Sequence, residues 1–543
     1  MRCTNLAVVS LGLSFTPALA QENSSARVDQ IFAAYDKPGS PGCALGVIRD
    51  GNFLYRHAYG MANLELGVPI SPSSVFYLGS LSKQFTAASV VLASEQGFLS
   101  LDDDVRKYIP EIPDYGHVIT LRQMLHHTSG FRDFLALLAL AGRDGSDVHS
   151  EAELIDLISR QKSLNNVPGE KYIYSNTNYF LLGVVIRRIT GKSLGQFAQD
   201  NIFRPLGMTH TRYYDDHTVV LSGRVSAYYP GSGNSYLVDW STDYDIVGGG
   251  GVTSTIDDLL LWDRNFYENK LGKGTLVKEL ETPGRLNNGK ESSYALGLEL
   301  ETYRGMPVVE HTGVLYGYRS DILRFPQQRF SVISLCNIGS AAVTNLTREV
   351  ADIYLENDPA AKTATSEALP KEHFPDPSPF AGRYLDPDNH FSYTFSASDG
   401  QLKAWGANLR RIGPNQFRDL GTGTITFKEV NGVMQAALVM DGETFFAGQR
   451  VSVPQLSAAN LLAYAGRYKS TEADATYTLA VNNGKLTLHH KWDTPVAFDV
   501  VAPDQFESGQ VGTLVFHRDE KHRITGLSIF TVTTRGVSFQ KTQ

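Results

Sequence analysis

The chain has 543 residues, of which 42% are hydrophobic and 20% charged, a composition typical of folded globular proteins and not of disordered ones. It is too long for a single hydrophobic core, so several domains are expected. The formal net charge of −8 argues against nucleic acid or an anionic membrane surface as a binding partner.

The first twenty residues have the pattern of a secretory signal peptide. Arg2 precedes the apolar run LAVVSLGLSF, and Ala18-Leu19-Ala20 fits a small-residue cleavage site, so cleavage after Ala20 is predicted. The apolar run is too short to span a bilayer and no later run is longer, so no membrane span is expected. These features predict a periplasmic or secreted protein.

Helical and strand patterns mix from residue 28 to residue 355, which predicts an α+β domain with helices against an antiparallel sheet. GCALGVIRDGNFLYRHAYGMA indicates two strands about a turn at Asp50-Gly51-Asn52. SLSKQFTAASVVLASEQG indicates a helix that ends at Gly97. A later helix is expected to begin at Ser254 as N-cap, with Asp257 three positions on. Strands are expected in YALGLEL, PVVEHTG and FSVISLCNI.

Residues 356–379 are rich in Pro, Ala, Ser, Thr and Glu without hydrophobic periodicity, which predicts a linker. An internal repeat follows. The motif FAGRY at Phe380 returns 84 residues later as YAGRY, and GTITF at Gly423 returns 89 residues later as GTLVF. Each copy has short alternating strands with turn residues, so two small antiparallel β-barrel domains are predicted at 380–455 and 456–543.

Three short motifs carry residue types that suit nucleophilic catalysis. Ser80 and Lys83 are three residues apart, which places both on one face of a helix. A serine hydroxyl needs a neighbouring base, and a buried lysine with a lowered pKa can be that base. Tyr174 and Asn176 stand two apart in a turn-rich segment before a helical pattern, and His311 precedes Gly313 after a strand. Each motif alone is also compatible with an ordinary helix start, loop or structural histidine.

The three motifs together, in the order S-x-x-K, Y-x-N and H-x-G, resemble those of the serine β-lactamase and penicillin-binding-protein superfamily. The stretches ITLRQMLHHTSGFRDF and GGGGVTSTIDDLLLW are similar to further segments of that superfamily. The resemblance covers residues 28–355 and implies the β-lactamase-like catalytic fold. With two trailing barrels and the closing segment LVFHRDEKHRITGLSIFTVTTRGVSFQ, the chain most resembles the D-aminopeptidase group within that superfamily.

The resemblance implies a role for each matching residue. Ser80 would be the acylated nucleophile, and Lys83 and Tyr174 would share the work of the base. Asn176 would orient the substrate amide. The N–H groups of Ser80 and of Val314, just past Gly313, would form the oxyanion hole.

His311 occupies a place where β-lactamases and D,D-peptidases commonly have lysine, a fixed cation suited to a substrate carboxylate. Because histidine is mostly neutral near pH 7, amide or peptide substrates without an anion at that point are favoured. An aminopeptidase must also hold an α-ammonium, for which Glu299 and Asp493 are candidates. Glu299 is expected on a strand that pairs with PVVEHTG, and Asp493 in an extra loop of the last barrel.

After loss of Cys3 with the signal peptide, only Cys43 and Cys336 remain. Two cysteines do not make a zinc site, no HExxH motif is present, and His126 and His127 would point apart on a helix, so no metal or cofactor is expected. Buried free thiols and a disulfide are both compatible with the sequence. The superfamily sheet, which places its first and last strands side by side, implies a Cys43–Cys336 disulfide.

The signal peptide and the resemblance together imply a secreted serine hydrolase that acts through an acyl-enzyme on amide or peptide bonds, of the D-aminopeptidase type. A β-lactamase, D,D-carboxypeptidase or esterase with the same catalytic residues remains the main alternative. A non-hydrolytic sensor or binding protein is the alternative from another class. The expected partner is a small peptide or amide substrate, with a homodimer left open.

Overall fold

The computed structural model describes residues 16–143, 147–239, 245–362, 376–404, 407–418, 423–440, 443–489 and 495–542. The predicted signal peptide lies largely outside these residues, and its end, residues 16–20, begins helix α1 (Thr16–Phe32). In the part of the chain that the structure describes, no helix is long and apolar enough to cross a membrane.

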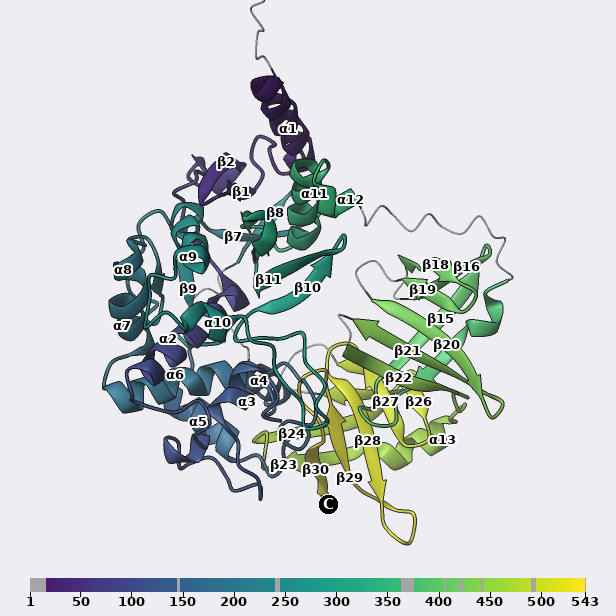
Figure 1. Cartoon of the computed structure of the whole chain (residues 1–543). Coiled ribbons are helices and arrows are strands. Elements are labelled where there is room, and N and C mark those ends of the chain that lie inside the picture. The colour runs from purple at the N-terminus through teal and green to yellow at the C-terminus, as the bar shows by residue number, and fades with distance from the viewer. Residues whose placement is uncertain are drawn as a thin grey trace, which may run out of the picture.

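A six-stranded antiparallel sheet forms the centre of the first domain, in the order β10-β11-β12-β13-β1-β2 (Figure 1). This order makes the first and last parts of the domain neighbours in space. Cys43 lies opposite Cys336 on adjacent strands, and a disulfide joins the two side chains, so the predicted bond is confirmed. The strands of this sheet are β1 (Cys43–Arg49), β2 (Asn52–Tyr59), β10 (Glu299–Tyr303), β11 (Met306–Leu315), β12 (Tyr318–Phe325) and β13 (Phe330–Cys336).

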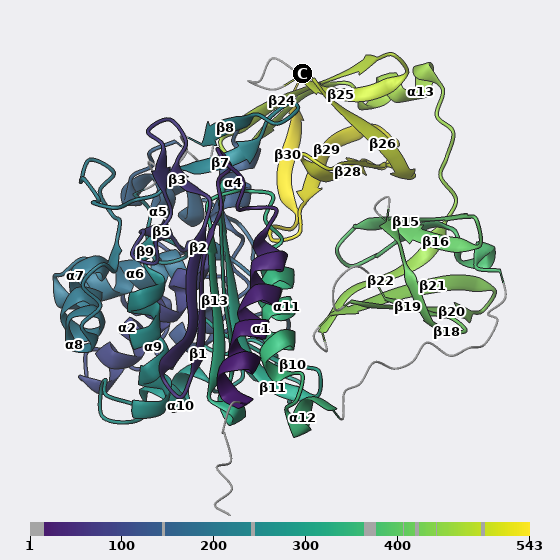
Figure 2. The ribbon, with the colours of Figure 1, turned by 90° about the horizontal axis from the view of Figure 1, so that it is seen from above.

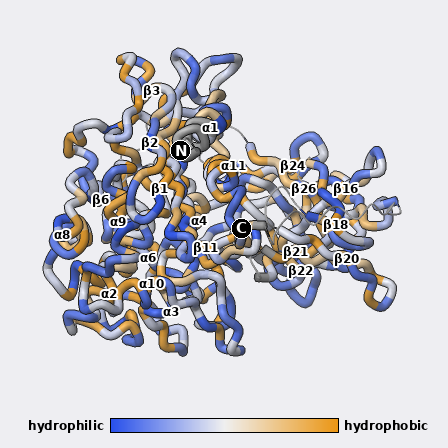
Figure 3. The backbone as a smooth tube through the Cα atoms, turned by 45° about the horizontal axis from the view of Figure 1, so that its top comes forward, coloured by the Kyte–Doolittle hydropathy of each residue, from blue (hydrophilic) through white to orange (hydrophobic). Residues whose placement is uncertain are grey.

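Helices cover both faces of the sheet, with α1 and α11 (Val343–Leu355) on one face and α2 (Lys83–Glu95) and α9 (Ile256–Glu268) on the other (Figure 2). Strand β1 is a hydrophobic stretch (Figure 3). Because alternate side chains of a strand point to opposite faces, β1 has apolar side chains on both faces of the sheet, and helices cover both. Leu45 packs into the cluster under α1 and α11, whereas Ile48 packs into the larger core on the α9 side.

Shorter elements complete this domain around the sheet. Its other helices are α3 (Leu121–Leu125), α4 (Phe134–Leu140), α5 (Glu151–Ser159), α6 (Asn176–Thr190), α7 (Leu194–Ala198), α8 (Arg204–Leu206), α10 (Leu276–Leu280) and α12 (Pro359–Lys362). Its short strands are β3 (Met61–Asn63), β4 (Val68–Pro69), β5 (Phe76–Tyr77), β6 (Arg212–Tyr213), β7 (Ala227–Pro230), β8 (Tyr236–Asp239) and β9 (Val252–Ser254).

The predicted ends of two helices fare differently. Helix α2 stops as predicted, since Gly97 follows its C-cap with a left-handed φ of 83°. The predicted N-cap of α9 is wrong by one residue: the Thr255 side chain, not that of Ser254, accepts the hydrogen bond, from the Asp258 N–H at 3.1 Å. Ser254 is still in β9, paired with Phe76, so the chain is extended there and the helix begins one residue later.

Two all-β units follow, as predicted. The first is a nine-stranded antiparallel sheet whose end strands, β17 and β18, are separated in the chain only by Leu409, so the sheet is nearly closed. The second is a closed eight-stranded barrel of β23 to β30. The strands of the first are β14 (Gly382–Leu385), β15 (Ser392–Ser398), β16 (Gln401–Ala404), β17 (Ala407–Asn408), β18 (Arg410–Gly413), β19 (Gln416–Arg418), β20 (Thr424–Val430), β21 (Val433–Met440) and β22 (Glu443–Val451). The second, preceded by α13 (Ala458–Leu461), has β23 (Gly466–Ser470), β24 (Ala475–Asn482), β25 (Lys485–His489), β26 (Val496–Ala502), β27 (Gln505–Ser508), β28 (Gly512–Arg518), β29 (Ile524–Phe530) and β30 (Val537–Thr542).

The sequence repeat corresponds to equivalent positions in these two units. Gly382 and Gly466, each at the start of the first strand of its unit, have φ angles of 142° and 141°. Two residues later, the buried Tyr384 and Tyr468 each donate a hydrogen bond to the carbonyl four residues earlier, at 2.9 and 2.7 Å. The repeat thus encodes the same strand start and the same buried tyrosine anchor twice.

Candidate active site

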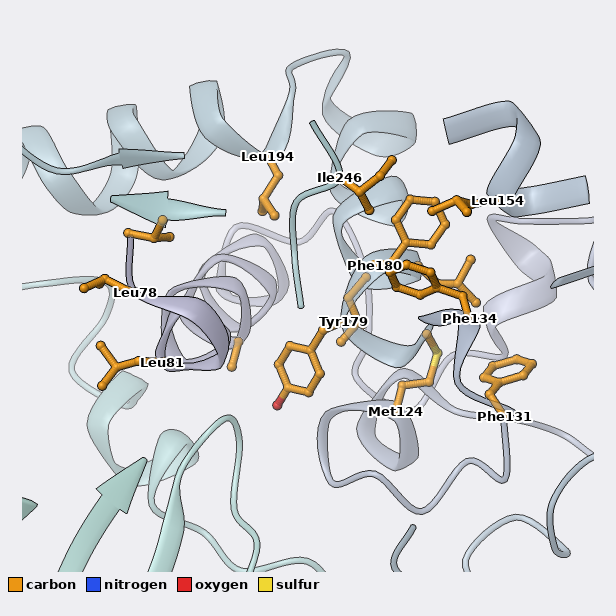
Figure 4. Packing of buried hydrophobic residues seen from close by; sticks show 14 of the residues in the cluster. Leu78, Leu81, Met124, Phe131, Phe134, Leu154, Tyr179, Phe180, Leu194 and Ile246 are labelled. Carbon is orange, nitrogen blue, oxygen red and sulfur yellow. The ribbon is translucent and has the colours of Figure 1, made fainter. Parts of the chain in front are cut away.

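Ser80 lies in a single 3-10 turn, Gly79–Ser82, that leads directly into α2. Leu78 and Leu81, which stand on either side of Gly79 and Ser80, are fully buried and belong to the large apolar core (Figure 4). Ser80 itself stays partly exposed. The two leucines therefore anchor the turn and leave the hydroxyl of Ser80 accessible from outside.

The structure brings together the two motifs that begin at Ser80 and Tyr174. Lys83 Nζ donates to Ser80 Oγ at 3.0 Å and to Asn176 Oδ1 at 2.9 Å. The Tyr174 hydroxyl donates to Ser80 Oγ at 2.9 Å from the other side. These four residues, Ser80, Lys83, Tyr174 and Asn176, are called the quartet below. Helix α6 begins at Asn176, earlier than its sequence pattern indicated, and this places the amide at the helix start facing α2.

Lys83 is completely buried, and its ammonium has a third acceptor in the Gly249 carbonyl at 2.5 Å. Burial lowers the pKa of Lys83 to about 7, while the carboxylates of Asp133 and Glu299 act in the opposite direction. Near pH 7 a large share of the lysine is therefore neutral. In that form its nitrogen has a lone pair for the proton of the Ser80 hydroxyl.

Tyr174 stays a neutral phenol, because burial raises its pKa above the usual value although the hydrogen bond to Ser80 lowers it. Its ring packs 4.3 Å from that of His127, and His127 Nδ1 accepts the N–H of Ser175 at 3.1 Å. His127, which the sequence analysis excluded as a metal ligand, is thus in contact with the segment that carries Tyr174. Lys83 is the better proton acceptor of the two candidate bases.

A buried carboxylate that the sequence did not single out holds Asn176. Asp133 Oδ2 accepts the backbone N–H of Asn176 at 2.5 Å and its side-chain amide at 2.9 Å. Asp133 Oδ1 accepts the N–H groups of Leu135 and Ala136 as the N-cap of α4. With its Nδ2 bound to Asp133, the Asn176 amide is fixed so that its oxygen faces Lys83. The only signal in the sequence was the helical pattern FLALLAL directly after an aspartate.

The terminal barrel packs against this same point of the catalytic domain. The Asp133 N–H donates to Thr534 Oγ1 at 3.0 Å, in the loop between β29 and β30. Beside it, Arg132 and Glu472 form an ion pair at 2.7 Å whose side chains are 1% and 2% exposed. Because charges so deeply buried are costly unless paired, this pair favours a fixed position of the barrel. The segment behind Asn176 therefore rests on a second domain.

The segment predicted to supply the oxyanion hole lies directly against the turn of Ser80. A Cβ atom on Gly79, whose φ is 56°, would lie 2.7 Å from the Val314 backbone nitrogen. A Cβ on Gly313 would collide with the Leu78 carbonyl. Only glycine permits so close an approach at either position. The two glycines therefore allow strand β11 to lie at Val314 against the turn of Ser80.

His311 is joined to the quartet only indirectly. Its Nδ1 lies 2.7 Å from the Thr312 carbonyl, an acceptor, so Nδ1 carries the proton, and its Nε2 accepts from the Tyr294 hydroxyl at 3.0 Å. Burial, aided by the charge of Lys83, lowers the pKa of His311 to about 3. The ring is neutral and both nitrogens are engaged inside the protein. Tyr294, which the sequence did not single out, packs edge-on against Tyr174 with a centroid separation of 6.3 Å.

A cavity of about 760 Å³ opens in front of Tyr174, and Glu299 lines it. Glu299 begins β10 and pairs with Glu310 of β11, so the predicted pairing is confirmed, although the strand begins later than the stretch YALGLEL in which it was expected. The second candidate for the ammonium, Asp493, lies outside the described residues. Among the described residues, no group of three or more His, Cys, Asp or Glu side chains is placed to hold a metal ion.

Comparison with known proteins agrees with this geometry. The Beta-lactamase family model matches residues 28–361. The D-aminopeptidase of Gluconobacter oxydans (strain 621H) is 30% identical over 402 residues, covering 72% of this chain and 71% of the relative. The D-aminopeptidase of Brucella anthropi is 26% identical over 529 residues, covering 93% and 96%. A penicillin-binding protein homologue from Pyrococcus abyssi has a similar fold, with a TM-score of 0.55, 19% identity and coverage of 87% of this chain and 98% of the homologue.

Proposed function

The chain belongs to the Beta-lactamase family and is a serine hydrolase, and on this premise we propose that it is a D-aminopeptidase-like enzyme. It would release N-terminal D-residues from peptides or amides through an acyl-enzyme on Ser80. The observation that carries the proposal is the contact of Ser80 Oγ with both the buried amine of Lys83 and the hydroxyl of Tyr174.

Acylation begins with Lys83 in its neutral form. Lys83 takes the proton of Ser80 as Oγ attacks the substrate carbonyl carbon and a C–O bond forms. The N–H groups of Ser80 and Val314 stabilise the oxygen that becomes negatively charged. When the C–N bond breaks, the leaving amine takes a proton. Lys83 gives up the proton that it took from Ser80, and Tyr174, which is a neutral phenol, donates its own proton to the amine and takes this one in exchange.

Deacylation reverses these roles. A water molecule attacks the acyl carbon, the bond to Ser80 Oγ breaks, and the serine regains its proton through Lys83 or Tyr174. Asn176, fixed by Asp133, holds Lys83 in position throughout.

Features outside the quartet support a substrate with a free ammonium. A relative that carries the name D-aminopeptidase aligns with 93% of this chain, the two β units included. The neutral His311 leaves the place beside the nucleophile turn without a fixed cation. Glu299 lies close enough for its carboxylate to raise the pKa of Lys83, and it lines the cavity in front of Tyr174. An α-ammonium bound by Glu299 would place the first peptide bond near Ser80.

A substrate panel tests the proposal on the wild type and on Ser80→Ala. The panel contains D-alanyl and L-alanyl p-nitroanilide, short-chain esters and a chromogenic cephalosporin. We expect turnover of the D-alanyl anilide by the wild type alone. Preferred turnover of the cephalosporin or of the esters would replace the proposal with a β-lactamase or an esterase. No turnover by a folded sample would contradict it.

We also propose that the enzyme acts outside the cytoplasm after cleavage behind Ala20. The disulfide between Cys43 and Cys336 supports this, because such bonds persist in oxidising compartments. The N-terminal residue of the protein from a periplasmic or culture fraction checks the proposal, with Gln21 as the expected residue. An N-terminus at Met1 in the active protein would contradict it.

A further inference from the structure

The cavity in front of Tyr174 is lined by all three units of the chain. Glu299 and Tyr174 come from the catalytic domain, Asp388 from the first β unit, and Val532 and Arg535 from the terminal barrel. Its volume of about 760 Å³ is typical of small-molecule sites and far exceeds one amino-acid side chain. The cavity therefore has room for a short peptide beyond the residue that is cleaved off.

Three cationic side chains among the described residues line this cavity, and they differ in whether the charged group is paired. Lys171 forms an ion pair with Asp388 at 3.2 Å, and Lys290 also has a partner of its own. Within the described ranges Arg535 has no ion pair, and its buried Nε has no acceptor. Arg535 is thus the cation of this lining that is available to a ligand.

Arg535 is presented by a fixed backbone. Its N–H donates to Asn165 Oδ1 at 2.8 Å, and its carbonyl accepts from Arg132 Nε at 2.9 Å. Arg132 is in turn held by the buried ion pair with Glu472. A guanidinium on so firmly held a segment loses little freedom when it binds an anion.

The surroundings of Arg535 compensate its charge only in part. Burial lowers the pKa of Arg535, although the carboxylates of Asp386 and Asp388 act in the opposite direction. Asp386 already accepts the Ala447 N–H at 2.9 Å and the Asn389 amide at 3.0 Å, and Asp388 is paired with Lys171. A desolvated cation without a close counter-ion is costly, and a ligand carboxylate would offset that cost.

We propose that Arg535 binds the C-terminal carboxylate of the substrate, so that the enzyme acts on short peptides that carry both a free ammonium and a free carboxylate. This rests on the proposed function and specifies its substrate class. Glu299 and Arg535 line the same cavity with opposite charges, which suits the two ends of a zwitterionic peptide. His311 is neutral and provides no fixed cation beside the turn of Ser80. Arg535 of the terminal barrel would provide one further along the cavity.

The test compares D-alanyl peptides ending in one, two or three glycines, each as the free acid and as the C-terminal amide. For at least one of the three peptide lengths, the KM of the wild type is expected to be lower for the free acid than for the amide. Arg535→Gln is expected to raise that KM about 10- to 100-fold, the effect of a lost hydrogen bond between charged groups, with the KM of the amide unchanged. Arg535→Lys, which keeps the charge without the fork of donors, should fall between the two.

Lys171→Gln is the matched control, since it removes a cation of the same lining that is already paired. It should change the KM values of acid and amide alike. Equal KM values of acid and amide in the wild type at every length, or an equal effect of Arg535→Gln on both, would overturn the proposal.

Binding to Ser80→Ala, measured by calorimetry, separates this proposal from the proposed function because it needs no turnover. Tighter binding of an acid than of its amide, lost when Arg535→Gln is added, would uphold the subsite even if the wild type did not cleave D-alanyl peptides. Equal binding of both forms, or binding of neither, would overturn it.

Discussion

The quartet and the lining of the cavity beside it are built in different ways. The quartet comes from two short segments of one domain, and every member is hydrogen-bonded to another, with Lys83 fully buried. The outer lining, which consists of Glu299, Asp388 and Arg535, comes from three units of the chain. Its side chains are partly or largely exposed, and that of Asp388 is 71% accessible.

We expect the quartet to carry out the reaction and the outer lining to bind the substrate. In the proposed mechanism the groups of the quartet act on the reacting atoms, so their loss should lower kcat strongly. In the proposed binding mode the groups of the outer lining would touch the ends of a substrate, so their loss should raise KM by modest factors. Substitutions on each side of this boundary can break or sharpen the distinction.

The largest effect is expected from Ser80→Ala. Without Oγ no acyl-enzyme can form, and kcat should fall about a thousandfold or more. Leu78 and Leu81, which anchor the turn, remain, so the melting temperature should stay close to that of the wild type. Retention of more than a tenth of the activity would place the nucleophile elsewhere.

Asp133→Asn should have the next largest effect, about 10- to 100-fold in kcat, because the amide of Asn176 loses a charged partner. The pH profile should shift as well. In the proposed mechanism activity requires neutral Lys83, so it should rise with pH through about 7. The Asp133 carboxylate raises the pKa of Lys83, so its loss should move this rise to lower pH.

Asp263→Asn is the control for Asp133→Asn. Asp263 is equally buried in the same domain and pairs with Arg324 at 3.0 Å, without a contact to the quartet. The control should lower the melting temperature and leave the midpoint of the pH profile in place. If Asp133→Asn lowered the melting temperature as Asp263→Asn does and left the midpoint of the pH profile unchanged, Asp133 would act only as the N-cap of α4.

Glu299→Gln should raise KM about tenfold for substrates with a free ammonium and leave that of their N-acetyl counterparts unchanged. Glu301→Gln is the matched control. Glu301 lines the same cavity, and its carboxylate pairs with Arg348 at 2.8 Å. If both variants weakened both classes of substrate equally, the ammonium site would lie elsewhere.

The smallest effect on kinetics is expected from the double change Cys43→Ser with Cys336→Ser. The disulfide joins β1 and β13 and contacts neither the quartet nor the outer lining. Its loss should lower the free energy of unfolding by about 2–5 kcal/mol and leave kcat and KM near the wild-type values. The mass of the wild type should not change on thiol alkylation without a reductant, and labelling of both cysteines would contradict the bond.

The distinction between the quartet and the residues around it also explains which parts of the site the sequence predicts well. Ser80 and Lys83 are three residues apart, which helix geometry turns into a direct contact, and Tyr174 and Asn176 are two residues apart, so that one reaches Ser80 and the other Lys83. Asp133 and Arg535 reach the site from segments far from these motifs, and an aspartate before a helix or an arginine in a hairpin loop has no distinctive pattern. The misplaced N-cap at Ser254 has a related cause, because pairing of β9 decides where α9 begins.

His311 shows a further limit of the sequence. The resemblance identified its position in the H-x-G motif, but its protonation depends on Thr312, Tyr294 and burial, which the motif does not encode. The repeat of the two β units was predicted, since Gly382 and Gly466 stand at equivalent offsets. That the terminal unit closes fully while the first stops just short of closure follows from the pairing of individual strands.

The central claim, that Ser80 is acylated because neutral Lys83 takes its proton, is tested most directly by labelling with a fluorophosphonate at a series of pH values. Mass spectrometry of the digested protein should place one adduct on Ser80, with a labelling rate that rises through about pH 7 and none in Ser80→Ala. An adduct on another residue, or no adduct in a sample that still hydrolyses the D-alanyl anilide, would contradict the account.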